Sequence, residues 1–278
     1  SYVYDTKTNF SFINYGVDYI PKNYDGSYRG AVTVRKALAG SLNVPAVNIL
    51  VKTGIDETID LAESMGLSTL GERNRFGPSL ALGGGEVKLL EHTAALGVFG
   101  NEGLKFPLNP VLTINDRLGE IVYQEDKTAE RVVDEETAYW INDILSDRKA
   151  RQYVFGLNSK LEIPGYEVAA KTGTTQEARD AWTIGYTPNI SVGVWSGNND
   201  NTPMKTGANG YVVAAPIWQE FMKEALKKVK TQKFAKPDEL KLEKKQYYSL
   251  EKKKVKEEVL EENIPKKQDV LTNINNTN

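Results

Sequence analysis

Apolar and polar positions alternate along residues 180–187 and 190–195, and a Pro-Asn pair at 188–189 separates the two runs. Alternation with a period of two is typical of a strand with one buried face, and a Pro-Asn pair favours a turn. Residues 165–174 lead into another extended run with many small side chains. The pattern therefore predicts three consecutive strands joined as an antiparallel meander.

Helical spacing of apolar residues appears in six other segments. Thr33 is expected to cap the first helix, the chain breaks at Asn43, and a second helix continues from Pro45 to Gly54. Further helices are predicted over residues 56–65, 89–103, 134–145 and 214–226. The positions expected to face inward are Val34, Ala37, Leu38 and Ser41; Val47, Leu50 and Val51; Ile59, Leu61, Ala62 and Met65; Ala138, Ile141, Ile144 and Leu145; and Ile217, Phe221 and Leu226.

The remaining segments show little periodicity. Residues 111–123, with a turn at 116–119, predict a β-hairpin, and residues 1–30 predict loops and short extended pieces. Residues 231–278 are rich in Lys, Glu and Asn and have few large apolar side chains, so burial cannot offset the entropy of ordering them. We therefore predict a folded domain over residues 1–230 and a charged tail, disordered or transiently helical, over residues 231–278.

Composition excludes several kinds of function. The 278 residues are 40% hydrophobic and carry a net charge of -2, so no basic excess is available to bind nucleic acid. The chain has no cysteine, which excludes disulfides and thiol nucleophiles, and its single histidine, His92, argues against a Ser-His-Asp triad or a multi-histidine metal site. The chain has no apolar run long enough to span a bilayer. It begins with Ser1 rather than Met, and we expect it to be a fragment.

The first candidate site is the run Lys171, Thr172, Gly173 and Thr174. The Lys ammonium is a compact cation, and the two Thr hydroxyls lie two residues apart and share one strand face. We expect these three side chains to bind a small carboxylate. Gly173 permits close approach of a substrate, and the Thr174 N–H is free to donate to a developing oxyanion.

The second candidate site is a short link between the first two helices. Ser41 and Asn43 lie two residues apart in this link, so both side chains can reach one cleft. The hydroxyl would then relay a proton, and the amide would bind a substrate peptide group. The alternative is that the two residues only cap the two helices.

Taken in order, these motifs resemble the transpeptidase domain of class A, bifunctional penicillin-binding proteins. The matching stretches are Pro-Lys-Asn-Tyr-Asp-Gly at 21–26, Ser-Leu-Asn at 41–43, Leu-Ala-Leu-Gly-Gly-Gly-Glu-Val at 80–87, Lys-Thr-Gly-Thr-Thr at 171–175 and Asp-Ala-Trp-x-x-Gly-Tyr-Thr-Pro at 180–188. The signatures of the family are Ser-x-x-Lys, a Ser-x-Asn element and Lys-Thr-Gly. The resemblance covers residues 5–226.

The resemblance implies an α/β fold, similar to penicillin-binding proteins and serine β-lactamases, in which a helical lobe faces an antiparallel sheet. It implies a serine-type D,D-transpeptidase that cross-links peptidoglycan stem peptides, is acylated by β-lactams and acts on the extracytoplasmic face of the bacterial membrane. In this role Ser41 relays protons, Asn43 holds the substrate amide, and Lys171 supplies positive potential. Thr172 and Thr174 grip the terminal carboxylate. No metal or cofactor is implied.

The nucleophile motif of the family, Ser-x-x-Lys, precedes the Ser-x-Asn element and lies on a buried helix. The two matches in this chain follow that element: Ser146 ends a polar helix, and Ser249 lies in the charged tail. We expect neither to be the nucleophile. We therefore expect a domain truncated at its N-terminus, without the nucleophile, the membrane anchor and the first two sheet strands, and inactive alone.

Two alternatives remain open. One is a D,D-carboxypeptidase or β-lactamase with the same fold, and the other is a non-catalytic module that binds cell-wall peptides at the Lys171 strand. All three hypotheses depend on one spatial prediction. The link that carries Ser41 and Asn43 must lie opposite the strand that carries Lys171, on the other wall of a single groove.

Overall fold

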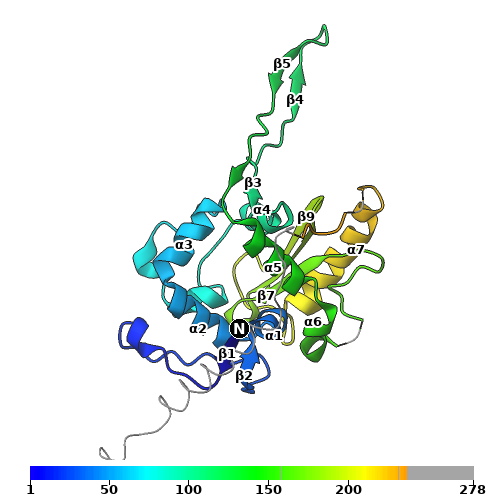
Figure 1. Cartoon of the computed structure of the whole chain (residues 1–278). Coiled ribbons are helices and arrows are strands. Elements are labelled where there is room, and N and C mark those ends of the chain that lie inside the picture. Colours follow the sequence, from blue (N-terminus) through cyan, green and yellow to red (C-terminus); the bar gives the residue numbers. More distant parts are fainter. Residues whose placement is uncertain (157, 231, 237–278) are drawn as a thin grey trace, which may run out of the picture. The chain divides into compact units, whose positions relative to one another are not determined.

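The computed structural model describes residues 1–156, 158–230 and 232–236. Residues Tyr2–Pro237 form one compact unit, and the fold is described for this unit. At its centre lies an antiparallel sheet of three strands in the order β7-β8-β9: β7 (Ala169–Thr174), β8 (Asp180–Thr187) and β9 (Ile190–Gly197). The predicted meander is therefore confirmed (Figure 1).

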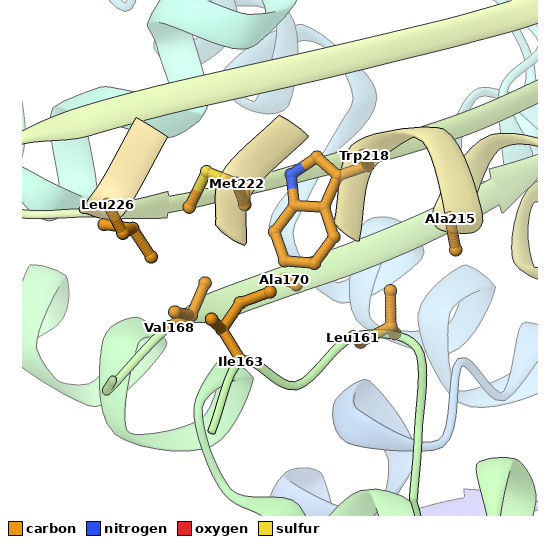
Figure 2. Close-up of a cluster of buried hydrophobic side chains, with 8 residues drawn as sticks. All are labelled: Leu161, Ile163, Val168, Ala170, Ala215, Trp218, Met222 and Leu226. Atoms are coloured by element: carbon orange, nitrogen blue, oxygen red, sulfur yellow. The ribbon is translucent and has the colours of Figure 1, made fainter. Parts of the chain in front are cut away.

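The two faces of this sheet are covered by different helices. On one face, Ala170 packs with Trp218 and Met222 of α7 (Ala215–Leu226), as Figure 2 shows. On the other face, Ala169 packs with Leu145 of α5 (Glu135–Leu145), and α4 (Leu89–Gly100) contacts β8 and β9. Because successive side chains of a strand point to opposite faces, neighbouring residues of β7 belong to two different cores.

The buried face of α7 differs from the prediction. Ile217 and Phe221 were expected to pack on the sheet, but they are 56% and 57% exposed, whereas Trp218 and Met222 are fully buried and Leu226 is buried as predicted. The sheet determines this choice, because the Trp218 ring lies directly over Gly185 of β8, where a Cβ atom would approach Trp218 Cζ2 to 2.3 Å. A flat aromatic ring needs a surface without a side chain, and Gly185 supplies it.

The helical lobe begins with a short antiparallel pair, β1 (Tyr2–Asp5) and β2 (Gly30–Thr33), and continues with α1 (Val34–Ala39), α2 (Asn43–Thr53) and α3 (Ile55–Ser64). Thr33 caps α1 as predicted, since its side chain accepts a hydrogen bond from the Lys36 N–H. In α3, Ile59 is buried but Leu61 is exposed, contrary to the prediction. Two residues apart on a helix, their side chains point about 200° apart, so only one can face the core.

The middle of the chain forms two small two-stranded sheets that are separate from the central sheet. Strands β3 (Leu104–Lys105) and β6 (Glu130–Arg131) pair with each other, and β4 (Thr113–Asn115) and β5 (Ile121–Gln124) form the predicted hairpin. Every residue of β4 and β5 is exposed, and Figure 1 shows the pair extending away from the sheet. The other short elements are α6 (Arg148–Phe155), the 3-10 turns Ser11–Ile13, Arg73–Arg75, Pro78–Leu82 and Gln176–Ala178, and a π-helical turn η5 (Gly210–Ala214).

Most of the predicted tail, residues 231 and 237–278, lies outside the described residues. Residues 232–236 are described, and the ring of Phe234 packs edge-on against Tyr186 of β8, with 5.9 Å between the ring centroids. The described part of the chain contains no helix that is both long enough and apolar enough to cross a membrane.

Candidate active site

The structure places Lys171 against Ser41. The Nζ of Lys171 donates hydrogen bonds to Ser41 Oγ, at 2.7 Å, and to the Thr172 carbonyl, at 2.6 Å. Lys171 lies in β7, and Ser41 lies in the link between α1 and α2, 130 residues earlier in the chain. The two candidate sites predicted from sequence therefore meet in one place.

Burial changes the acid–base behaviour of Lys171. Loss of water around its ammonium lowers the pKa of Lys171 from 10.5 to about 8. The side chain has no carboxylate partner among the bonds that it makes in the described structure, and its two acceptors are neutral oxygens. An amine with such a pKa can give up and regain a proton close to neutral pH, as proton transfer during catalysis requires.

The backbone of Ser41 adopts a left-handed conformation, with φ of 55°. The Ser41 N–H donates to the Leu38 carbonyl and the Leu42 N–H donates to the Ala37 carbonyl, which is the hydrogen-bond pattern of a Schellman helix end. Glycine is the usual residue at this position, so a serine here costs about 1 kcal/mol of backbone strain. A glycine would avoid this strain but would offer no side chain, whereas Ser41 places its hydroxyl next to the Lys171 ammonium.

Asn43 begins α2 and is bound by the loop around residues 22–23. Its backbone N–H donates to Asn23 Oδ1 at 2.8 Å, and its side-chain Nδ2 donates to the Lys22 carbonyl at 2.7 Å. The amide predicted to hold substrate is thus oriented by the protein itself. Its second N–H and its Oδ1 atom provide the donor and the acceptor that a peptide group requires.

Thr172 and Thr174 lie on the strand face opposite to Lys171. Thr172 pairs with Thr183 of β8, whose Oγ1 donates to the Gly210 carbonyl, and Thr174 Oγ1 accepts a hydrogen bond from the Gly210 N–H at 3.0 Å. The sequence prediction did not include Gly210. A Cβ atom there would approach the Gly173 and Trp182 carbonyl oxygens to 2.4 Å, so only glycine fits.

Strand β7 is an edge strand. Among the described residues it pairs with β8 alone, and two of its carbonyls accept side-chain bonds, that of Thr172 from Lys171 and that of Ala170 from Arg151. The edge near Thr174 is therefore the part left for a ligand backbone. A further contact missed by sequence reasoning joins the two sides of the site, because Asn209 Nδ2 donates to Tyr24 Oη at 3.3 Å. Tyr24 follows Asn23 in the loop at Asn43, and Asn209 precedes Gly210. In the sequence, this loop was marked by the Pro-Lys-Asn-Tyr-Asp-Gly stretch at 21–26 that resembles the family.

Two other features do not belong to the site. His92 of α4 packs its ring against Trp182, with 5.6 Å between centroids, and burial lowers the pKa of His92. A surface hollow of about 570 Å³ is lined by residues 71–75, and its two guanidinium groups are already paired with carboxylates, Arg73 with Asp60 and Glu63, and Arg75 with Glu86. Neither feature contacts Ser41 or Lys171 through a described hydrogen bond.

Fold and site together define a class of protein. Here a Lys-Thr-Gly edge strand contacts a Ser-x-Asn element that is carried by a helical lobe. This is the arrangement of serine β-lactamases and penicillin-binding proteins. Residues 5–223 match the family model of the penicillin-binding protein transpeptidase domain. The chain therefore belongs to the penicillin-binding protein transpeptidase family.

Similar proteins indicate the class A type. Over 225 residues the chain is 36% identical to penicillin-binding protein 1A of Aquifex aeolicus, covering 81% of this chain and 30% of that protein. It is 35% identical over 204 residues to penicillin-binding protein 1B of Haemophilus influenzae, covering 73% of this chain and 25% of that protein. The chain thus spans less than a third of the length of these relatives.

Solved structures support the same fold. The penicillin-binding protein PonA1 from Mycobacterium tuberculosis superposes with a TM-score of 0.73 at 24% identity, covering 86% of this chain and 66% of that chain. Penicillin-binding protein 1A from Haemophilus influenzae superposes with a TM-score of 0.72 at 23% identity, covering 86% of this chain and 40% of that chain. The expectation of a penicillin-binding protein fold is confirmed.

Proposed function

We propose that this domain supplies the substrate-binding groove and proton-relay groups of a peptidoglycan D,D-transpeptidase, with stem peptides ending in D-Ala-D-Ala as substrates and β-lactams as inhibitors. The observation that supports this most directly is the 2.7 Å hydrogen bond from Lys171 Nζ to Ser41 Oγ. It joins a lysine of lowered pKa to a hydroxyl beside an open strand edge, as an acyl transfer to and from a serine requires.

The reaction has two acyl transfers. The Oγ atom of a nucleophilic serine attacks the carbonyl carbon of the penultimate D-Ala, the peptide C–N bond breaks, and the terminal D-Ala leaves with the proton released by the serine. An amine of a second stem peptide then attacks the ester, the ester C–O bond breaks, and a proton returns to the serine oxygen. Ser41 and Lys171 carry the proton in each step, because a lysine with a pKa of about 8 exchanges protons readily.

The other site residues bind the peptide. The open edge of β7 pairs with the substrate backbone, and the free groups of the Asn43 amide bind a substrate peptide group. Thr174 Oγ1 accepts a bond from Gly210, but its own proton is free to be donated to a terminal carboxylate, and the Thr172 hydroxyl adds a second donor. A β-lactam enters the same groove, and its ring amide takes the place of the scissile bond.

The nucleophile is not supplied by the two Ser-x-x-Lys matches. Ser146 ends α5, its Oγ donates to the Asn142 carbonyl at 2.7 Å, and Asp147 caps α6 before Lys149. Ser146 and Lys149 therefore lie on two different helices and cannot share one helix face. Ser249 lies outside the described residues. We infer that residues 1–278 alone are not acylated.

A peptide-binding module is the second candidate, because the same edge and amide would hold a stem peptide without any nucleophile. A carboxypeptidase or β-lactamase differs only in that water, instead of an amine, removes the acyl group. We place the activity on the extracytoplasmic face of the membrane, where peptidoglycan peptides are cross-linked.

Two measurements test the proposal. The 278-residue chain is expected to bind a D-Ala-D-Ala stem pentapeptide reversibly, with NMR shift changes at residues 171–174, and to form no covalent adduct with labelled penicillin. Lys171→Met is expected to weaken peptide binding by about tenfold, which corresponds to roughly one charge-assisted hydrogen bond. Lys149→Met, which removes an exposed lysine of α6, serves as the control. A penicillin adduct on Ser146 would overturn the assignment.

A longer chain in which this domain follows a Ser-x-x-Lys segment separates enzyme from module. If the domain is a transpeptidase, labelled penicillin acylates that longer chain, and Lys171→Met slows acylation by about 100-fold or more, the usual scale for loss of an acid–base group. Reversible peptide binding without acylation in that protein would instead favour the module. The product formed when D-Ala is released in the presence of an amine acceptor distinguishes the two reactions. Transpeptidation gives a peptide joined to the amine, and hydrolysis gives a free carboxylate.

A further inference from the structure

Two buried polar side chains lie behind the site and are unused by the proposed chemistry. Asp5 of β1 is 0% exposed, and Asn23 is 5% exposed. Asn23 Nδ2 donates to both carboxylate oxygens of Asp5, at 2.7 and 2.9 Å, and to the Ser27 carbonyl at 2.8 Å. Burying a carboxylate costs free energy unless it is hydrogen-bonded. An apolar pair would fill the same space at lower cost, which indicates a structural role for this pair.

The amide of Asn23 is fixed in one orientation by these bonds. With its NH₂ group held by Asp5 and Ser27, its Oδ1 atom must point the other way, where it accepts the backbone N–H of Asn43 at 2.8 Å. If the amide flipped, its oxygen would face the Asp5 carboxylate and its NH₂ group would face the Asn43 N–H. Asp5 therefore fixes the orientation in which the Asn23 amide oxygen accepts from the Asn43 N–H.

This acceptor replaces a missing helix cap. The N-cap residue of α2 is Leu42, and within the described structure no side chain at that position caps the helix. Asn23 satisfies the first free N–H of α2 from a distant loop, and the negative charge of Asp5 is relayed through a polarised amide to the positive end of the helix. The next residue back, Lys22, binds the Asn43 side chain through its carbonyl.

Asp5 also binds the segment that leads into α1. We call the link between α1 and α2, which carries Ser41 and ends at Asn43, the elbow. The Asp5 carboxylate accepts the Arg29 backbone N–H at 3.0 Å, and Asp5 pairs with Gly30 at the start of β2. Strand β2 runs directly into α1 at Thr33 and Val34. The same carboxylate therefore holds α1 through β2 and holds α2 through Asn23, and Ser41 lies between these two helices.

We propose that Asn23, oriented by Asp5, is a positioning residue that sets the elbow of Ser41 and Asn43 against Lys171. The role of this elbow in binding substrate rests on the proposed function, but the positioning itself does not. Displacing the elbow admits water to the Lys171 ammonium and weakens the bond from Asn43 to Asn23, and both effects are measurable without substrate.

The test uses an exchange of the two groups in the 278-residue chain. Asn23→Asp places two carboxylates face to face, and Asp5→Asn replaces one of the two oxygens that accept from Asn23 Nδ2 by an NH₂ group, so each single change weakens the pair. The combined variant restores one amide and one carboxylate, and the introduced carboxylate still accepts from the Asn43 N–H. It lacks the donor to the Ser27 carbonyl and the ion pair between Asp5 and the Arg29 guanidinium, which are 3.7 Å apart in the wild type.

Two NMR readouts follow the elbow. In each single variant we expect hydrogen exchange of the Asn43 amide to become about tenfold faster, the scale of one lost hydrogen bond, and the Lys171 titration to move from about 8 toward 10.5. The combined variant is expected to recover most of both changes. General loss of stability would not raise the Lys171 pKa in the folded state and would not be reversed by a second substitution.

A matched control lies in the same segment. Asn9 Nδ2 donates to Asp18 Oδ1 at 2.7 Å, but this Asn-Asp pair is exposed and does not contact the elbow. Asn9→Asp and Asp18→Asn are expected to leave both readouts unchanged. Wild-type readouts in Asn23→Asp and Asp5→Asn, or equal changes in the control variants, would overturn the proposal.

Folding failure also gives an answer. If a single variant does not fold, recovery of folding in the combined variant supports the proposal, and failure of the combined variant to fold overturns it. Failure of the proposed function looks different. A chain that binds no stem peptide but shows the expected shifts would refute the substrate role and leave the positioning role standing.

Discussion

Replacing Lys171 by methionine tests how the fold accommodates the buried charge of this side chain. Methionine keeps the length of the side chain and removes the ammonium. Burial lowers the pKa of Lys171 from 10.5 to about 8, so the folded state disfavours the charged form. At about 1.4 kcal/mol per pH unit, this difference corresponds to about 3 kcal/mol of destabilisation at neutral pH. Some surface of Lys171 remains exposed, and solvent screening makes this figure an upper limit.

The sign of the pH dependence follows from proton counting. Below about pH 8 the folded and unfolded states are both protonated at Lys171, and the penalty is complete. Between about 8 and 10.5 the folded state loses the proton while the unfolded state keeps it. The unfolded state then binds more protons, so stability rises with pH. Above 10.5 both states are neutral and the penalty is gone.

Hydrogen bonds act in the opposite direction. Lys171→Met loses the bonds to Ser41 Oγ and to the Thr172 carbonyl, at about 1 kcal/mol each. At about pH 7 the variant is therefore expected to be more stable than the wild type by about 1 kcal/mol. By about pH 10 this advantage should shrink by about 2 kcal/mol and change sign.

Urea unfolding followed by tryptophan fluorescence measures this difference across the pH range. Groups that titrate in both proteins cancel when the wild type is subtracted from the variant. Lys149→Met removes an exposed lysine of α6 and should give a difference near zero at every pH. A stability difference for Lys171→Met that stays constant from about pH 7 to pH 10 would refute the claim that burial lowers the pKa of Lys171.

Three further outcomes are expected. Ser41→Ala removes an acceptor of the Lys171 ammonium, so the pKa of Lys171 should fall further below about 8 in an NMR titration, and a rise would contradict the contact. Trp218→Ala should lower the free energy of unfolding by about 3–5 kcal/mol, whereas Phe221→Ala on the exposed face of α7 should cost under about 1 kcal/mol; equal losses would mean that the helix phase is wrong. Asp134→Ala should cost about 1 kcal/mol, because Asp134 caps α5 through the Thr137 N–H, and urea titrations should show this cost disappearing as pH falls below the ordinary carboxyl range, since hydrogen bonds hold the pKa of Asp134 below 3.8.

Much of the local structure was determined by the sequence alone. Alternation over residues 180–195 and a Pro-Asn turn predicted strands β8 and β9, and both are present. The alternation implied one buried face, but β8 is buried on both faces because helices pack against each side of the sheet. Thr33 and Asp134 mark helix starts, since a side-chain oxygen there satisfies an N–H that the helix cannot. The Ser-Leu-Asn and Lys-Thr-Gly motifs by themselves also indicated the family.

The tertiary structure decided what the pattern left open. The apolar residues of α7 fit two helix phases, and only the bare surface of Gly185 selects Trp218 over Phe221 for the core. The lowered pKa of Lys171 depends on the groups that surround its ammonium. The acceptor for Asn43 comes from Asn23, and Asn23 is oriented by Asp5, 18 residues earlier. Spacing along a chain fixes which side chains share a face, but burial, charge and hydrogen bonding depend on what the fold brings against that face.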